Sequence, residues 1–557
     1  MMPLLSARFS SSPYTRTKRK LPDCVVTLTS LSETGQEESK IPVLKQRSYT
    51  GIWVISSALA DTLCVDLGVN GVLKELNTAL GTSYKLGSVN SILEPYIAQN
   101  VDFGTAYAYL RPYWMGIRGI EYELRTREVQ DREMRRNVLT DCWITKWDVP
   151  PRRVWDLCAN RVVPYWVARS RRWAISHAWV DEKDRVDVMT PINGCEWPVP
   201  MPKGANLDLI RIEMLNAAQR LDPHPREAYV WLDVLCLRQE GGKNEHLRLD
   251  EWKLDVPTIG AVYKSSLVIY YFNGLGQPLD LTPGYFESDR CWFRRAWTLQ
   301  EISHVPIIAG KTGKAIVDKH VETRFNQEVM ELKSLHGVLG LTSILGYVSD
   351  MRNRVSTKPL DKVAGLVYPL SLEVIPIYDA TQSPEEAWEE LMDVMGSEYQ
   401  AELLFLYPEP GDGEKRWRPS WLQVMSNRIV LPWYPGKNKM FPTKCLHIDC
   451  YFGYCIKSGT VRGLGEVPNE STPRQGEMDF NDVSGAPRTL KIIADHMHPI
   501  PDGVYTLLGC TGHPDRWVVG QLRPDGTFEK LSVFCSTADE VDLRKLELDR
   551  YVESFLR

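Results

Sequence analysis

The fold of this chain follows from nine residues, Tyr229-Val-Trp-Leu-Asp-Val-Leu-Cys-Leu237. Apart from one aspartate the run is apolar, which is typical of a strand buried on both faces in a parallel sheet. Trp173–Trp179 and Leu267–Phe272 are further short apolar runs, and helix-like segments separate them from the first run. Strands that alternate with helices in this way predict a parallel α/β layer with right-handed crossovers.

Helices are predicted between and after these strands. Leu207–Leu221 gathers its apolar residues on one helical face. Glu251–Ser265 is expected to be helical only in part, because Pro257 interrupts it. A further helix is expected over Trp292–Ile302, and a strand over Val305–Ala309 should follow it.

The 557 residues are too many for one hydrophobic core, so several domains are expected. Val72–Leu80 and Arg125–Asn137 have the spacing of helices ahead of the α/β layer. The predicted units are a disordered basic tail over 1–23, a mostly helical region over 24–170, the α/β domain over 171–310, a helical extension over 311–440 and a β-rich domain over 441–557.

The last unit is expected to consist of strands separated by Gly, Pro and Asp turns. Pro524-Asp525-Gly526 marks a hairpin turn, and Asp539–Leu556 is expected to form a closing helix. The expected strands cover Cys445–Leu464, Thr489–Ala494, Gly503–Leu508 and Arg516–Gln521.

Composition narrows the class of protein. The net charge of −5 argues against a nucleic-acid binder, which would usually be basic. The apolar run Gly51–Ala60 is too short to span a bilayer, so we expect no membrane segment. The twelve cysteines lack CxxC pairs, as expected of reduced thiols in a cytoplasmic protein, and the group Cys445, Cys450 and Cys455 lacks zinc-site spacing. We expect no metal site.

Glu301 is the candidate catalytic residue. It ends a segment rich in tryptophan and arginine, and on a helix Trp297 would lie one turn away on the same face. A carboxylate held against aromatic surface is less solvated than an ordinary surface charge, and a fixed carboxylate of this kind can stabilise positive charge on a sugar.

Four more polar or aromatic residues are predicted to line the same site. Ser176, His177 and Trp179 follow one predicted strand, and Asp233 interrupts another. In open α/β sheets ligands collect at the carboxyl ends of the strands, where these residues are expected. Together with Trp297, they are the candidate substrate-binding residues.

Structural roles are the alternatives for the same residues. Glu301 can form an ion pair with Arg294 or Arg295 that fixes its segment. Asp233 can be a hydrogen-bonded structural carboxylate, since a buried charge needs a partner or a function. His177 can equally be a structural histidine.

Three segments of this chain, taken together and in order, resemble the fungal heterokaryon incompatibility (HET) domain. They are Trp173-Ala-Ile-Ser-His-Ala-Trp179, Tyr229-Val-Trp-Leu-Asp-Val-Leu-Cys-Leu-Arg-Gln239 and Arg294-Arg-Ala-Trp-Thr-Leu-Gln-Glu301. The resemblance covers roughly 171–310 and continues more weakly at Arg354 and Pro359-Leu-Asp-Lys362.

The HET domain is in turn distantly similar to Toll/interleukin-1 receptor (TIR) domains, some of which cleave NAD with a glutamate in a Trp-x-x-x-Glu segment. Trp297 and Glu301 match that spacing. The resemblance therefore implies a TIR-like sheet, a role in fungal non-self recognition and programmed cell death, and an NAD hydrolase whose nucleotide is a substrate rather than a cofactor.

Two hypotheses about function follow. In the first, the chain is an NAD glycohydrolase with Glu301 as its carboxylate. In the second, it is a non-catalytic signalling module that assembles through its TIR-like layer. Under either hypothesis, the expected partners are further copies of the α/β domain and an upstream sensor or a downstream protein.

Overall fold

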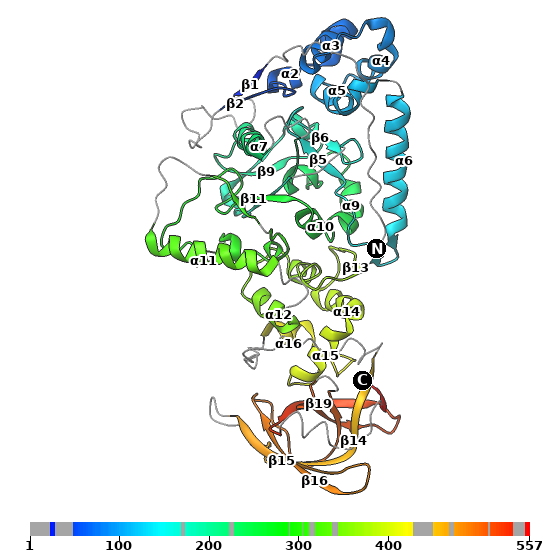
Figure 1. The fold of residues 1–557 in the computed structure, drawn as a ribbon, viewed down its shortest axis with the longest axis vertical. Helices are drawn as coiled ribbons and strands as arrows, with labels where there is room; N and C mark the ends of the chain where they lie inside the picture. The colour runs from blue at the N-terminus through cyan, green and yellow to red at the C-terminus, as the bar shows by residue number, and fades with distance from the viewer. Residues whose placement is uncertain are drawn as a thin grey trace, which may run out of the picture.

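The computed structural model describes residues 23–27, 48–117, 119–168, 173–221, 228–288, 290–303, 305–310, 318–336, 343–426, 449–466, 473–510, 513–538 and 552–557. Figure 1 shows N-terminal helices at one end, a mixed sheet beneath them, a group of helices below the sheet and a strand-rich unit at the far end. The mixed α/β character expected from the sequence is confirmed. The basic tail lies outside the described residues.

The N-terminal region is helical, as its spacing predicts. The predicted helices Val72–Leu80 and Arg125–Asn137 both lie inside longer observed helices. Asp102 caps one helix by accepting a hydrogen bond from the Thr105 backbone N–H at 2.7 Å. The elements are β1 (Cys24–Thr27), β2 (Ser48–Gly51), α2 (Ser57–Ala60), α3 (Cys64–Leu80), α4 (Asn90–Ala98), α5 (Phe103–Leu110) and α6 (Ile120–Val138).

A six-stranded sheet forms the centre of the molecule, in the order β12-β11-β7-β10-β5-β6. The first four strands pair in parallel, whereas β5 pairs antiparallel with β10 and β6 pairs antiparallel with β5. Because β5 and β6 precede residue 171, the sheet begins ahead of the predicted α/β boundary. The strands are β5 (Arg153–Asp156), β6 (Arg161–Pro164), β7 (Trp173–His177), β10 (Tyr229–Trp231), β11 (Leu267–Tyr271) and β12 (Ile307–Ile308).

Three helices of the central region agree with the sequence predictions. α7 (Leu207–Leu221) matches its predicted range, and the two pieces α9 (Arg248–Asp255) and α10 (Ile259–Lys264) flank Pro257. Small antiparallel pairs complete this part of the chain. They are β3 (Leu139–Thr140) with β4 (Trp143–Ile144) and β13 (Ile375–Pro376), and β8 (Arg185–Val188) with β9 (Val199–Pro202).

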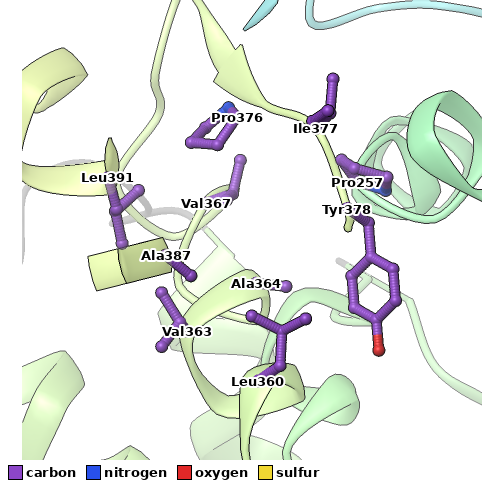
Figure 2. A pocket seen from close by; sticks show the side chains of 10 residues that line it. All are labelled: Pro257, Leu360, Val363, Ala364, Val367, Pro376, Ile377, Tyr378, Ala387 and Leu391. Atoms are coloured by element: carbon purple, nitrogen blue, oxygen red, sulfur yellow. The ribbon is translucent and has the colours of Figure 1, made fainter. Parts of the chain in front are cut away.

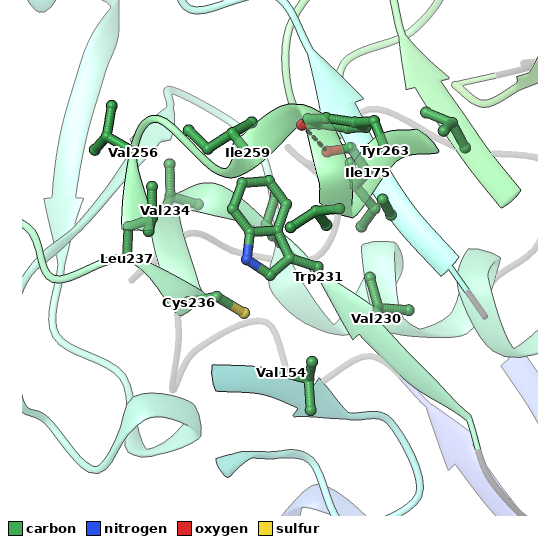
Figure 3. Close-up of a cluster of buried hydrophobic side chains, with 14 of the residues drawn as sticks. Val154, Ile175, Val230, Trp231, Val234, Cys236, Leu237, Val256, Ile259 and Tyr263 are labelled. Atoms are coloured by element: carbon green, nitrogen blue, oxygen red, sulfur yellow. Dashed lines mark hydrogen bonds between the residues drawn. The ribbon is translucent and has the colours of Figure 1, made fainter. Parts of the chain in front are cut away.

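The strand predicted over Tyr229–Leu237 is wrong in its second half. β10 ends at Trp231, and α8 (Asp233–Cys236) follows. The Asp233 carboxylate accepts the Val234 backbone N–H at 2.7 Å, which turns the chain out of the extended conformation. Figure 3 shows the Trp231 indole among the surrounding side chains, and its ring meets that of Tyr263 edge to face at 5.5 Å.

The helix predicted over Trp292–Ile302 is also wrong. Two short 3₁₀ turns stand there, η7 (Trp292–Arg294) and η8 (Trp297–Gln300), separated by an extended Arg295. Arg295 forms a parallel bridge with Val355, whose carbonyl accepts the Ala296 N–H at 3.0 Å. Backbone pairing with a segment far along the chain therefore replaces the continuous helix.

Helices return beyond the central sheet, as predicted. Ser383 and Glu386 form a reciprocal capping box at the start of one of them. The helices are α11 (Lys319–His336), α12 (Ile344–Arg352), α13 (Leu360–Ala364), α14 (Pro384–Val394), α15 (Ser397–Leu406) and α16 (Trp421–Ser426).

Six of the C-terminal strands close into an antiparallel barrel, because β14 pairs with β17 on one side and with β15 on the other. Its interior is filled by apolar side chains that include Met478, Leu507 and Trp517. The strands are β14 (Cys450–Arg462), β15 (Arg474–Asn481), β16 (Pro487–Ala494), β17 (Gly503–Gly509), β18 (Arg516–Leu522) and β19 (Phe528–Ser536).

The predicted turn at Pro524-Asp525-Gly526 joins β18 to β19, and Gly526 adopts the left-handed φ of +86° that this turn requires. The closing helix is wrong over its final residues. β20 (Val552–Phe555) pairs there with the start of β14 instead, and residues 539–551 lie outside the described part. β20 pairs with the first residues of β14. This pairing satisfies backbone groups of β14 that a helix over the same C-terminal residues would leave without this partner.

Candidate functional site

The candidate residues gather at the carboxyl ends of two neighbouring parallel strands. Ser176 and His177 are the last residues of β7, and Asp233 lies two positions beyond the end of β10. β7 also pairs with β11 on its other side, which places Tyr270 opposite Ser176. The expectation that these residues meet at one edge of the sheet agrees with this geometry.

The Glu301 carboxylate is held at the end of a two-step hydrogen-bond relay. The Trp292 indole N–H donates to Ser176 Oγ at 2.7 Å, and Ser176 Oγ donates to Glu301 Oε2 at 2.5 Å. Since the indole can only donate, it occupies a lone pair of Ser176 and leaves the serine hydrogen for the carboxylate. The relay therefore fixes Ser176 as a donor to Glu301.

The backbone around Glu301 is braced from two sides. The Tyr270 hydroxyl donates to the Glu301 carbonyl at 2.7 Å. Arg354 Nη1 donates to the Arg295 carbonyl and to Thr298 Oγ1, both at 2.8 Å. These bonds tie the two 3₁₀ turns to the sheet and to the segment after α12, so the position of Glu301 does not depend on a continuous helix.

Burial dominates the electrostatics of Glu301, which is 8% exposed. Desolvation raises its pKa to about 7 with help from the negative charge of Asp233, while the Ser176 hydrogen bond and the charges of His177 and Arg295 act in the opposite direction. Within the described residues, no ion pair joins Glu301 to an arginine or lysine. Arg295 acts on Glu301 through its charge, which lowers the pKa of the carboxyl against the effect of burial.

His177 and Asp233 form a second, adjacent network. His177 Nε2 lies 2.8 Å from Asp233 Oδ1, and the Trp179 indole N–H donates to Asp233 Oδ2 at 2.9 Å. Burial alone would lower the pKa of His177, but Asp233 and Glu301 raise it above its usual value. Burial alone would raise the pKa of Asp233, but His177 and its N–H donors lower it. The pair therefore favours an imidazolium beside a carboxylate.

Trp297 does not join this group, contrary to its predicted position one helical turn from Glu301. Because η8 is a short 3₁₀ turn, its indole instead hydrogen bonds to Asp361 and lies 6.2 Å from the Tyr378 ring. Trp292 lies next to Ser176 instead, a position that the sequence does not predict. Its only sequence signal is its membership of the same aromatic segment.

An apolar cavity of about 20 Å³ is lined in part by Tyr378, whose ring lies 6.2 Å from that of Trp297. This volume is close to that of one water molecule, so it is too small for a nucleotide. Figure 2 shows the side chains around it, which are Pro257, Leu360, Val363, Ala364, Val367, Pro376, Ile377, Tyr378, Ala387 and Leu391. The Glu301 group does not line it.

No cluster of three or more His, Cys, Asp or Glu side chains suited to a metal ion occurs in the described part of the chain. Cys445 lies outside that part, while Cys450 and Cys455 lie on β14. Nor does any described helix combine the length and apolar character needed to cross a membrane.

Comparisons with family models, curated proteins and solved structures gave no match to this chain.

Proposed function

We propose that this chain hydrolyses the nicotinamide–ribose bond of NAD at the site around Glu301. NAD and water give ADP-ribose, nicotinamide and a proton. The C–N bond breaks with its electron pair passing to the pyridinium nitrogen, so nicotinamide leaves as a neutral molecule. Water supplies the oxygen that bonds to the ribose carbon, and its proton passes to a base or to solvent.

The buried Glu301 carboxylate, held by Ser176, is the observation that carries this proposal. The energetic barrier lies in the positive charge that develops on the ribose, and a fixed carboxylate stabilises that charge most in a site with little water. With a pKa of about 7, Glu301 is substantially ionised at neutral pH and can also receive the proton from water.

The neighbouring network supplies the remaining roles in this scheme. The Trp179 ring stacks on the His177 ring, with centroids 5.9 Å apart, and its indole N–H is fixed by Asp233. A fixed aromatic face at a strand end suits stacking against a planar pyridine ring. The His177 imidazolium offsets the negative charges of Asp233 and Glu301 that flank it.

The biological setting of the proposal rests on the resemblance of the three segments to HET domains. Under this proposal the chain acts in fungal non-self recognition and programmed cell death in the cytoplasm, and its central sheet is TIR-like. Arg354 and Asp361, from the weaker downstream segment, contact the Glu301 segment through Thr298 and Trp297. These contacts support the proposal, because they join the downstream segment to the segment that ends at Glu301.

The second candidate is a non-catalytic signalling module. The near-complete burial of Ser176, His177 and Glu301 favours it, since the same hydrogen bonds would stabilise a domain that only assembles. Under this candidate NAD is not consumed at any protein concentration, whereas self-association is retained.

Release of nicotinamide from NAD by the full chain discriminates between the two candidates. We expect wild type to release it and Glu301→Gln to lose the activity, measured over a range of protein concentrations that includes the self-associated form. Glu402→Gln is the matched control, because Glu402 is a buried glutamate of α15 whose pKa is also raised to about 7 by burial. Absence of release from wild type at every concentration would overturn the enzyme proposal.

A further inference from the structure

Gln300, immediately before Glu301, is a buried amide without hydrogen-bond partners. Its side chain is 5% exposed, and neither its Nε2 nor its Oε1 has a partner. Other buried polar groups of the described chain lack a partner at one atom, such as Asn193 Oδ1 or Asn206 Nδ2. Gln300 is the residue of that set with two unmet side-chain atoms, the nitrogen and the oxygen of its amide.

Such a group is costly in the unliganded protein. Buried polar atoms are nearly always hydrogen bonded, and an exception calls for a ligand, a water or a functional reason. Leu299, which precedes Gln300, is buried and apolar and offers no side-chain partner, and the carboxylate of Glu301, which follows it, accepts from Ser176. The Trp297–Gln300 turn is braced by Arg354 through Thr298, so the amide cannot easily move to solvent.

We propose that Gln300 recognises the carboxamide of the nicotinamide ring. This inference rests on the proposed function, and it names the residue that selects the leaving group. A primary carboxamide offers one acceptor and two donors on a planar frame, which complements the unmet donor and acceptor of Gln300. A carboxylate in the same place offers no donor and brings a second negative charge close to Glu301.

Binding of the product nicotinamide to the full wild-type chain tests this directly, without any requirement for hydrolysis. Gln300→Met keeps the length of the side chain and removes both polar atoms. We expect it to weaken nicotinamide binding about tenfold or more, because the ligand carboxamide then loses its partners on burial. Binding of ADP-ribose, which lacks the carboxamide, is expected to be unchanged. Wild type is also expected to bind nicotinic acid more weakly than nicotinamide, and this preference should become smaller in the variant, where only the repulsion from Glu301 remains.

Thermal unfolding supplies a second readout with a matched control. If the amide is unmet in the free protein, Gln300→Met leaves the melting temperature unchanged or raises it. Tyr399→Phe removes another buried polar atom without a partner, in α15, and should behave alike in unfolding while leaving nicotinamide binding intact. A fall of several degrees in the melting temperature of Gln300→Met, without a similar fall in Tyr399→Phe, would show that a bound water already satisfies the amide. That result would overturn the inference.

The inference and the proposed function can fail separately. Equal nicotinamide affinity in wild type and Gln300→Met, or no binding by wild type, overturns the inference even if NAD is hydrolysed. Binding that depends on Gln300 in a protein that never hydrolyses NAD removes the enzyme proposal and leaves a carboxamide-binding site.

Discussion

Ser176 and Glu301 are 125 positions apart in the chain, yet Ser176 Oγ lies 2.5 Å from Glu301 Oε2. The serine is buried in the central strand of the parallel sheet, and the glutamate follows an irregular segment of 3₁₀ turns. A hydrogen bond to the charged form of a carboxyl stabilises that form. Ser176 thus favours ionisation of Glu301 against the larger, opposing effect of burial, and so lowers the pH at which the carboxylate forms.

Loss of the relay should raise the pKa of Glu301 above its wild-type value of about 7. In Ser176→Ala the carboxylate loses its donor, and in Trp292→Phe the serine hydroxyl loses the bond that orients it. Titration of the Glu301 side-chain carbon by NMR should show both shifts. In the double variant the Trp292 change should add nothing, because it acts through Ser176. Independent, additive shifts would contradict a relay.

Glu301→Gln should make the protein relatively more stable as pH rises. Below about pH 4.5 the carboxyl is protonated in both the folded and the unfolded state, so ionisation contributes no difference. Between 4.5 and about 7 only the unfolded state ionises, so wild-type stability falls with increasing pH, by roughly 3 kcal/mol in total. Denaturant unfolding of both proteins from pH 4 to 8 measures this. Parallel pH dependences would mean that Glu301 is not desolvated.

Asp233→Asn should lower the pKa of His177 from its raised wild-type value, because the charge of Asp233 is the largest effect that opposes burial there. Asparagine retains the shape of the side chain and its contact with Trp179, so the change in charge is isolated. We expect a loss of stability on the order of 2 kcal/mol near pH 6, less than for a fully buried pair because Asp233 is partly exposed. Imidazole titration by NMR is the measurement, and an unchanged His177 pKa would contradict the pairing.

Lys530 of β19 should be a site of stabilising substitution. Its ammonium group is buried against the Leu403 carbonyl of α15, at 3.3 Å, and burial lowers its pKa to about 7. Below pH 7 the folded protein carries a buried charge. This cost diminishes as pH rises from 7 towards 10.5, where the unfolded lysine also loses its proton.

Lys530→Met is therefore expected to gain stability mainly at and below neutral pH, by at most roughly 5 kcal/mol. Unfolding of wild type and variant at pH 6 and pH 10 measures the gain. Lys415→Met, at a partly exposed lysine that pairs with Asp449, serves as the comparison and should show no such gain. A gain that is as large at pH 10 as at pH 6 would contradict the assignment of a buried charge.

Local pattern was sufficient for the elements whose own apolar spacing is regular. The apolar spacing of Leu207–Leu221 gives α7, and Leu267–Phe272 gives β11 with one residue of difference. The predicted helix over Trp292–Ile302 fails because Arg295 pairs with the backbone of Val355, a contact that no window around residue 295 contains. Closure of the barrel likewise depends on β14 pairing with both β15 and β17.

The polar members of the candidate site could be predicted from the sequence, but the tryptophan beside Ser176 and the contacts could not. Strand ends placed Ser176, His177 and Asp233 together, as they are. The choice between Trp292 and Trp297 as the neighbour of the site depends on whether their segment is an α-helix or two 3₁₀ turns. Helical spacing favoured Trp297, and the observed turns select Trp292 instead.

If Glu301 is the catalytic carboxylate, wild type releases equal amounts of nicotinamide and ADP-ribose from NAD, and its kcat/KM rises with a single ionisation near pH 7. In the variant Glu301→Gln, kcat/KM falls at least about a hundredfold. A kcat/KM in Glu301→Gln equal to that of wild type across this pH range would contradict the catalytic role of Glu301.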